Sequence, residues 1–265
     1  MDNVIEKFPI LKFTEIGSSS VEDDIIRESP LTIILNNREL ATLLCSPMNL
    51  RYLAIGFLFS EGLLQSKEEI RKIMVDEQRG VVRVETVRRE KFDGEALFKR
   101  FITSGCGRGG ASFYSATDVQ GRVKIESEIE ISPLAVLALV NEFQQRSRIY
   151  RATGGVHSAA LCDMKNILVF SEDIGRHNAI DKIFGECILN DIATEDNIII
   201  TSGRVSSEIL LKVARRNIPI IISKSAPTNL GLRLAADLGV TVVGFVRGRR
   251  MNVYTHVGRI ATDGK

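Results

Sequence analysis

The sequence contains no C-x-x-C pair, no apolar run long enough to cross a bilayer and almost no excess of charge. Its four cysteines, Cys45, Cys106, Cys162 and Cys187, lie far apart, so we expect neither a disulfide framework nor a bound metal ion. The formal net charge of +2 is too small to indicate nucleic acid as a partner. We expect no membrane insertion. The first ten residues also lack the basic region and apolar core of a signal peptide, which predicts a cytoplasmic protein.

The composition is that of a globular protein with a sizeable core. The 265 residues are 44% hydrophobic and 26% charged, which allows one large domain or two smaller ones. We expect residues 1–125 to form the smaller α+β region, which ends in a cysteine loop at 101–112. Residues 126–265 are expected to form an α/β domain.

The first region mixes strand and helix signals. Residues 31–35, beside two asparagines, resemble one arm of a hairpin. A helix that is apolar nearly all round follows Ser46 and Pro47 and ends at Gly62, which indicates burial on more than one side. Residues 66–74 predict a second, amphipathic helix, and residues 81–87 alternate like a half-exposed strand.

The second region has a regular rhythm of strands and helices. Ser132 and Pro133 mark a helix start. Beyond it, strands are predicted at 159–162, 167–171, 198–201, 219–223, 241–246 and 251–255, with helices at 178–189, 206–216 and 230–238. This alternation predicts a three-layer α/β/α domain whose mixed sheet is largely parallel and is covered on both faces.

Three polar turns follow predicted strands at the edge where such sheets bind ligands. Residues 201–204 read T-S-G-R, and residues 223–229 read S-K-S-A-P-T-N. The third turn consists of Phe245, Val246, Arg247, Gly248, Arg249 and Arg250. Backbone N–H groups and arginines suit phosphates, so the turns predict an anionic, nucleotide-like ligand. Simple solvation of charged loops is the alternative.

Cys106 lies in T-S-G-C-G-R-G-G, at residues 103–110. Glycine favours irregular backbone, and a neighbouring arginine favours the thiolate, so this stretch predicts a mobile loop that carries a reactive thiol. An ordinary flexible loop that happens to hold a cysteine is the alternative. Cys162 and Cys187 have apolar neighbours and are expected to be buried, whereas the setting of Cys45 is ambiguous.

The three histidines lie in separate motifs. His157 follows two glycines at a strand entry, which makes it the better functional candidate. His177 lies at a helix start that Asp173 can cap. His256 follows the last strand and is expected to face the same ligand edge.

Six motifs, taken together and in order, resemble one family. They are S-G-C-G, T-G-G-V-H-S-A-A-L, E-D-I-G-R-H-N-A-I-D-K, T-S-G-R-V-S-S-E-I, S-K-S-A-P-T-N-L and G-F-V-R-G-R-R-M-N-V-Y-T-H. They resemble the formate dehydrogenase accessory sulfurtransferase family, FdhD/NarQ. The resemblance implies a cytidine-deaminase-like α/β domain joined to a smaller one, and a homodimer.

The resemblance also implies an activity. A member would be an enzyme, a sulfurtransferase that accepts persulfide sulfur from a cysteine desulfurase. It would pass the sulfur to the molybdenum cofactor, Mo-bis(molybdopterin guanine dinucleotide), for formate dehydrogenase. Cys106 falls on the family's persulfide-forming cysteine, and residues 245–250 fall on its cofactor-binding segment. Many members have C-x-x-C in the loop, but Gly109 stands at the second position here. Deaminase chemistry is not expected, because H-x-E and P-C-x-x-C are absent.

Two other functions remain open at this point. A non-catalytic chaperone that binds the molybdenum cofactor for formate dehydrogenase would need the arginine turn but not the thiol. A cysteine hydrolase would instead combine Cys106 with His157 and Asp173, which can be adjacent in space although they are distant in sequence.

Overall fold

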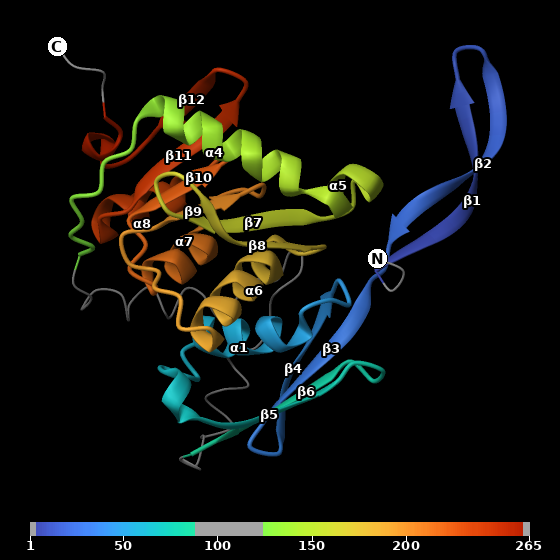
Figure 1. Ribbon diagram of the computed structural model, residues 1–265, viewed down its shortest axis with the longest axis horizontal. Helices are drawn as coiled ribbons and strands as arrows, with labels where there is room; N and C mark the ends of the chain where they lie inside the picture. The colour runs from blue at the N-terminus through green and yellow to red at the C-terminus, as the bar shows by residue number, and fades with distance from the viewer. Residues whose placement is uncertain (1–3, 88–123, 262–265) are drawn as a thin grey trace.

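Two β-sheets form the body of the protein, two crossing helices join them, and a long hairpin extends away from them (Figure 1). The computed structural model describes residues 4–87 and 124–261. The cysteine loop predicted at 101–112 lies outside these ranges. The expected division into residues 1–125 and 126–265 stays a prediction.

The first sheet has four strands in the order β4-β3-β6-β5. Its strands are β3 (Ser29–Leu35), β4 (Arg38–Cys45), β5 (Ile70–Asp76) and β6 (Val81–Thr86). β3 and β4 form the predicted hairpin, whose turn residues Asn36 and Asn37 have φ angles of 47° and 67°. The apolar helix α1 (Leu50–Ser60) is almost wholly buried, as its sequence indicates.

The prediction of a helix over 66–74 is wrong. Residues 67–69 form a single 3-10 turn, η1 (Lys67–Glu69), and the chain then enters β5, which pairs antiparallel with β6. The pairing register shifts between Ile70 and Lys72, and Ile70 and Ile73 both pack against the core around α1. A bulge adds one residue to the strand, so an apolar spacing of three imitates a helix here.

The second sheet has six strands in the order β12-β11-β10-β9-β7-β8. They are β7 (His157–Cys162), β8 (Ile167–Asp173), β9 (Ile198–Thr201), β10 (Ile220–Ser223), β11 (Thr241–Arg247) and β12 (Arg250–Val253). All six predicted strands are present, and the sheet is mixed. Parallel pairing is confined to β9, β10 and β11, a smaller share than the sequence indicates, because β7, β8 and β12 pair antiparallel.

Helices cover both faces of this sheet, which gives the predicted three layers. The helices of this region are α4 (Pro133–Arg146), α5 (Arg148–Thr153), α6 (Arg176–Leu189), α7 (Ser207–Ala214), α8 (Asn229–Leu238) and the 3-10 turn η2 (Val257–Arg259). α6, α7 and α8 share one apolar core with the sheet, and α4 packs on the opposite face. The Ser132 hydroxyl accepts the N–H of Ala135 at 3.2 Å, which confirms the predicted helix start. None of the helices in the described ranges is long and apolar enough to span a bilayer.

The two sheets are held together where α1 crosses α6. Gly56 and Gly185 allow this close approach: a methyl group on Gly56 would overlap the carbonyl oxygen of Asp181, and one on Gly185 would overlap that of Tyr52. The backbones of the two helices therefore touch, and no larger residue fits at either glycine.

A buried ion pair lies beside this crossing. Lys182 and Asp173 have no exposed side-chain surface, and their Nζ and Oδ2 atoms are 2.7 Å apart. Asp173 Oδ2 also accepts the N–H of Ser46 at 3.2 Å, and Asn178 donates to the carbonyl of Leu44 at 2.9 Å. This network fixes the end of β4 against β8 and α6.

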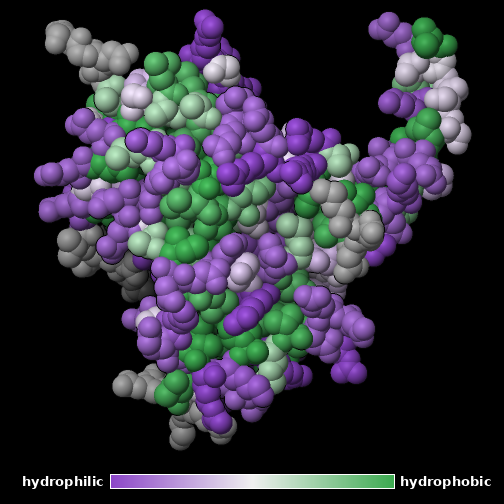
Figure 2. Space-filling model, in the orientation of Figure 1, coloured by the Kyte–Doolittle hydropathy of each residue, from purple (hydrophilic) through white to green (hydrophobic). Residues whose placement is uncertain are grey.

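The N-terminal hairpin, β1 (Ile5–Thr14) with β2 (Gly17–Ile26), forms a two-stranded sheet of its own. Apolar side chains are exposed along it, and the exposed fractions of Leu11, Phe13 and Ile16 are 59%, 75% and 97%. Figure 2 shows the outer part of the hairpin standing clear of the body, with apolar residues near its tip. An isolated hairpin is marginal in water, and its exposed apolar surface is typical of a protein contact.

Candidate functional site

The carboxyl ends of β9, β10 and β11 bring the three predicted turns side by side. The N–H of Lys224 donates to the carbonyl of Thr201 at 3.3 Å, and the N–H of Phe245 donates to the carbonyl of Ser225 at 3.1 Å. Val205 donates to Ala226 at 3.1 Å. These backbone bonds tie each turn to the next, so the turns form one continuous edge, as expected for parallel strands.

The arginine turn is the tip of the β11–β12 hairpin. Arg247 and Arg250 are cross-strand partners, and Gly248 and Arg249 connect them; Gly248 has a φ angle of 58°. All four residues are exposed. The turn therefore presents three guanidinium groups to solvent from a rigid sheet.

A bulge precedes this turn. The register shifts between Gly244 and Arg247, and Phe245 has a φ angle of 53°, which is rare for a bulky residue. The Arg247 guanidinium lies 5.9 Å from the centre of the Phe245 ring. Val246 is 1% exposed and packs in the core, so only its backbone is available to a ligand. The bulge turns the other side chains outward.

Lys224 lies beside the arginine turn. Arg247 Nε donates to the carbonyl of Lys224 at 3.4 Å. Burial, and then the charge of Arg247, lower the pKa of Lys224 from its ordinary value. Neither cation forms an ion pair with a carboxylate in the described part of the chain. Two neighbouring cations without an acidic partner are typical of an anion site.

His157 faces the end of β9. Its Nδ1 lies 3.1 Å from the hydroxyl of Ser202, and that hydroxyl accepts the N–H of Ser158 at 3.0 Å. Burial, and then the charges of Arg176 and Arg204, lower the pKa of His157 from 6.5, so the ring is neutral at pH 7. His157 thus lies at the predicted ligand edge, beside the turn that follows β9.

The other two histidines have different surroundings. Burial, followed by the cations Lys212 and Arg176, lowers the pKa of His177 to about 3. Its Nε2 lies 3.3 Å from Glu208 Oε2, and because the ring is neutral this contact is not an ion pair at neutral pH. The prediction that His256 faces the ligand edge is wrong: its carbonyl accepts from Thr241, the first residue of β11, which lies at the opposite end of the strand. β12 runs antiparallel to β11 and carries His256 away.

Asp173 does not cap α6 in the way predicted. Gly175 is the N-cap residue and makes no side-chain cap. Asp173 Oδ1 accepts from the N–H of Gly175 and from Asn178 Nδ2, each at 2.9 Å, while Oδ2 binds Lys182. Its oxygens therefore serve the buried network rather than His157.

Three of the four cysteines are fully buried. Cys162 and Cys187 are 0% exposed, as predicted, and so is Cys45. Burial raises the pKa of each thiol to about 12, so none of the three is a thiolate at neutral pH. Cys106 lies outside the described residues.

Sequence reasoning missed Arg176. Its side chain lies over the backbone of Gly203, where an added methyl group would come within 2.9 Å of Arg176 Cβ. The arginine in E-D-I-G-R-H-N was the available signal, but it precedes β9 by more than twenty residues. Only the packing of α6 against β7 and β8 brings it to the end of β9.

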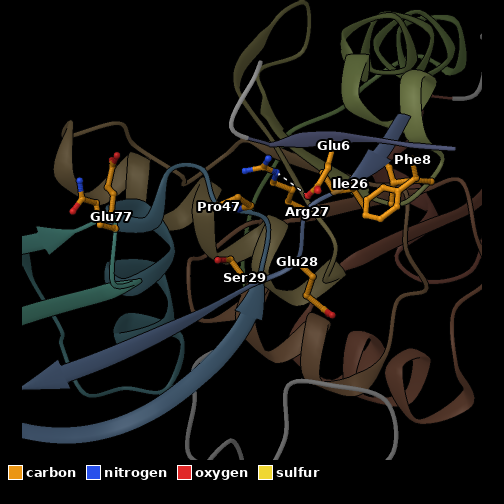
Figure 3. A pocket seen from close by; sticks show the side chains of 10 residues that line it. Glu6, Phe8, Ile26, Arg27, Glu28, Ser29, Pro47 and Glu77 are labelled. Carbon is orange, nitrogen blue, oxygen red and sulfur yellow. Dashed lines mark ion pairs between the residues drawn. The ribbon is translucent and has the colours of Figure 1, made fainter. Parts of the chain in front are cut away.

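A hollow of about 670 Å³ lies at the base of the N-terminal hairpin. Figure 3 shows Phe8 and Ile26 beside Arg27, which is paired with Glu6 at 3.3 Å. Glu28 and Glu77 also line it. This acidic lining does not suit an anionic ligand.

A metal site was not expected. Within residues 4–87 and 124–261, no group of three or more His, Cys, Asp or Glu side chains is arranged to hold a metal ion. The absence of a bound metal stays a prediction, because Cys106 and its neighbours are not among these residues.

Comparisons with known proteins agree with the motifs. The FdhD/NarQ family model matches residues 26–261. A protein of Bacillus subtilis (strain 168) named sulfur carrier protein FdhD is 46% identical over 259 residues, 98% of each chain. A protein of Staphylococcus aureus (strain Newman) with the same name is 40% identical over 252 residues, 95% of each chain.

A solved structure has the same fold. A crystal structure from Desulfotalea psychrophila, described as a formate dehydrogenase accessory protein, has a TM-score of 0.80 and 28% sequence identity, and the match covers 97% of this chain and 100% of that one. The matched length and the identity to its relatives leave one assignment: the chain belongs to the FdhD/NarQ family.

Proposed function

We propose that this protein is a sulfur carrier that supports formate dehydrogenase. In this proposal it is an enzyme, a sulfurtransferase. Cys106 accepts persulfide sulfur from a cysteine desulfurase, and the sulfur passes to Mo-bis(molybdopterin guanine dinucleotide), which is the bound substrate. The names of the relatives support the sulfur-carrier role.

The observation that carries the proposal concerns the thiols. Three of the four cysteines are buried and have a pKa of about 12, so they are poor nucleophiles. Cys106 is the one remaining cysteine. Its neighbours are glycines and Arg108, which favour an accessible thiolate.

The proposed sulfur-acceptance step balances without a further redox partner. The Cys106 thiolate attacks the outer sulfur of the donor's persulfide and forms an S–S bond. The donor's own S–S bond breaks, and its cysteine leaves as a thiolate that takes up a proton. Cys106 then carries the terminal sulfur that is handed on. Because Gly109 replaces a second cysteine, the loop cannot trap the persulfide in an internal disulfide.

The basic edge suits the proposed substrate. Its pyrophosphate groups are anionic, and Lys224 and Arg247 offer cations that no described carboxylate neutralises. Arg247, Arg249 and Arg250 would contact the phosphates or the guanine, and Gly248 would let the ligand approach the backbone.

The contacts of Asp173 weigh against a cysteine hydrolase. A hydrolase would need Asp173 to orient His157, but the carboxylate binds Lys182, Asn178 and backbone N–H groups. His157 is held by Ser202 instead. The third member of such a triad is therefore engaged elsewhere.

A homodimer forms part of the proposal. Phe13 and Ile16 on the projecting hairpin are 75% and 97% exposed, and such surface favours contact with another chain. Phe13→Asp should lower the apparent mass in sedimentation if the hairpin joins two copies. An unchanged mass from a dimeric parent would place the contact elsewhere.

Mass spectrometry tests the central step. After incubation with a cysteine desulfurase and cysteine, the peptide that contains Cys106 should gain the mass of one sulfur atom. Cys106→Ala should gain none and should not activate formate dehydrogenase, whereas Cys187→Ala should retain both properties. A Cys106→Ala variant that still activates the dehydrogenase would support the cofactor chaperone instead.

A further inference from the structure

A second group of basic side chains lies at the end of β9, apart from the arginine turn. His157 contacts Ser202, and the charges of Arg176 and Arg204 both act on the His157 ring. Arg204 is exposed, and the other three residues are partly buried. Four groups from three separate segments thus converge on one place.

No carboxylate among the described residues is paired with this cluster. Neither Arg176 nor Arg204 forms an ion pair with a carboxylate in the described ranges. Asp173 also lies near His157, but it is fully buried and its oxygens bind Lys182, Asn178 and backbone N–H groups. Two cations that act on the same ring and have no acidic partner favour an anion beside them.

The position of Arg176 also favours an anion at this cluster. Its Nε is shielded from solvent and has no hydrogen-bond partner among the described residues. Its aliphatic carbons rest on the backbone of Gly203, with Cδ within 3.0 Å of where a methyl group on that glycine would lie. The glycine therefore leaves room for the arginine, and packing holds the guanidinium at the edge.

We propose that Arg176, Arg204, Ser202 and His157 form a phosphate-binding subsite, separate from the arginine turn of residues 247–250. Its ligand is a phosphate or pyrophosphate group, because guanidinium groups bind such oxygens in pairs. When the Ser202 hydroxyl donates to Nδ1 of the neutral His157 ring, Nε2 carries a proton that can be donated to the same anion. The identification of a larger ligand rests on the proposed function; the subsite itself does not.

The spacing suits one extended ligand. Neighbouring strands lie about 4.8 Å apart, so the ends of β9 and β11, two strands apart, are separated by about 10 Å. Lys224 directly follows β10, the strand between them. A nucleotide with several phosphate groups can therefore touch both the subsite and the arginine turn.

Calorimetry with two probes, inorganic pyrophosphate and GDP, tests the subsite. Arg204→Ala should weaken the binding of either probe by about ten- to a hundred-fold, as for a charge-assisted hydrogen bond. Arg176→Gln, which keeps most of the aliphatic stem, should do the same. Arg71→Ala is the matched control, because Arg71 is an exposed arginine on β5 of the other sheet.

The outcomes separate this proposal from the arginine turn. If Arg247→Ala weakens GDP binding but Arg204→Ala and Arg176→Gln behave like Arg71→Ala, the subsite is refuted and the turn survives. If Arg204→Ala and Arg176→Gln weaken binding while Arg247→Ala does not, the subsite stands and the turn is not the site. If GDP binds and pyrophosphate does not, the ligand of the subsite is a phosphate group of a nucleotide. If both probes bind, the subsite also accepts a free pyrophosphate anion.

NMR gives an independent readout. The chain has three histidines, so its ring signals can be assigned with single His→Gln variants. Pyrophosphate should shift the His157 signals in a saturable way and leave His256 unmoved, because His256 lies at the opposite end of β11. A His157 signal that moves with neither saturating pyrophosphate nor saturating GDP would overturn the proposal.

Discussion

Replacing Lys182 with methionine should sharply destabilise the protein, because it leaves a buried carboxylate without its cation. Lys182 and Asp173 are both 0% exposed, and 2.7 Å separates their charged atoms. Breaking a buried pair by removing one partner costs roughly 3–5 kcal/mol. Asp173 keeps three N–H donors, from Ser46, Gly175 and Asn178, so we expect a value near the lower end, about 3 kcal/mol.

The assay is urea and thermal unfolding of Lys182→Met beside a matched control. Arg146 and Glu142 are also 2.7 Å apart, but their side chains are 45% and 39% exposed, so Arg146→Met should cost less than about 1 kcal/mol. At about 2–4 °C per kcal/mol for a chain of this size, Lys182→Met should lower the midpoint by roughly 6–12 °C.

Two results would refute this reasoning. Equal losses for Lys182→Met and Arg146→Met would mean that burial does not set the cost. A double variant, Asp173→Asn with Lys182→Met, should recover much of the loss because no unpaired charge remains. If it is no more stable than Lys182→Met, the desolvated carboxylate is not the source of the loss.

Three further predictions concern the helix crossing, the thiols and a histidine. Gly56→Ala should lower the free energy of unfolding by about 3 kcal/mol or more, the upper end of the usual effect of overpacking, because the added methyl group would overlap backbone atoms. Urea unfolding measures this loss, and Gly258→Ala, whose methyl group would enter open space, should unfold like the parent. A thiol reagent at pH 8 should label Cys106 and spare the three buried cysteines, whose pKa of about 12 keeps them protonated; labelling of a buried cysteine first would contradict this. Since the pKa of His177 is lowered from 6.5 to about 3, the unfolded chain binds the extra proton as the pH falls through 6.5, and acid destabilises the fold. His177→Gln should therefore flatten the loss of stability between pH 6.5 and 3, and an unchanged pH profile would refute the assignment.

The second region was readable from its sequence because its elements are locally consistent. Buried strands such as residues 198–201 are continuous apolar runs, and Ser132 with Pro133 starts a helix whatever packs on it. The three turns at the ends of β9, β10 and β11 could be predicted in the same way, because parallel strands must present them at one edge. Two predictions were wrong because they depend on pairing between distant segments. The bulge at Ile70 gave a strand the apolar spacing of a helix, and the antiparallel β12 places His256 at the end of the sheet opposite the ligand edge.

The sequence by itself determined the family and the apolar pattern of the α/β domain. It also determined where along the chain the glycine-rich cysteine segment and the arginine turn lie. These depend on neighbouring residues, whose spacing and chemistry are visible in the chain. Only the tertiary structure decided that Cys45 is buried, that Lys182 and Asp173 neutralise each other, and that Arg176 joins Arg204 beside His157. The burial of a side chain and the pairing of its charge depend on contacts with residues that are distant in sequence. They are therefore set by the folded chain and not by the local pattern.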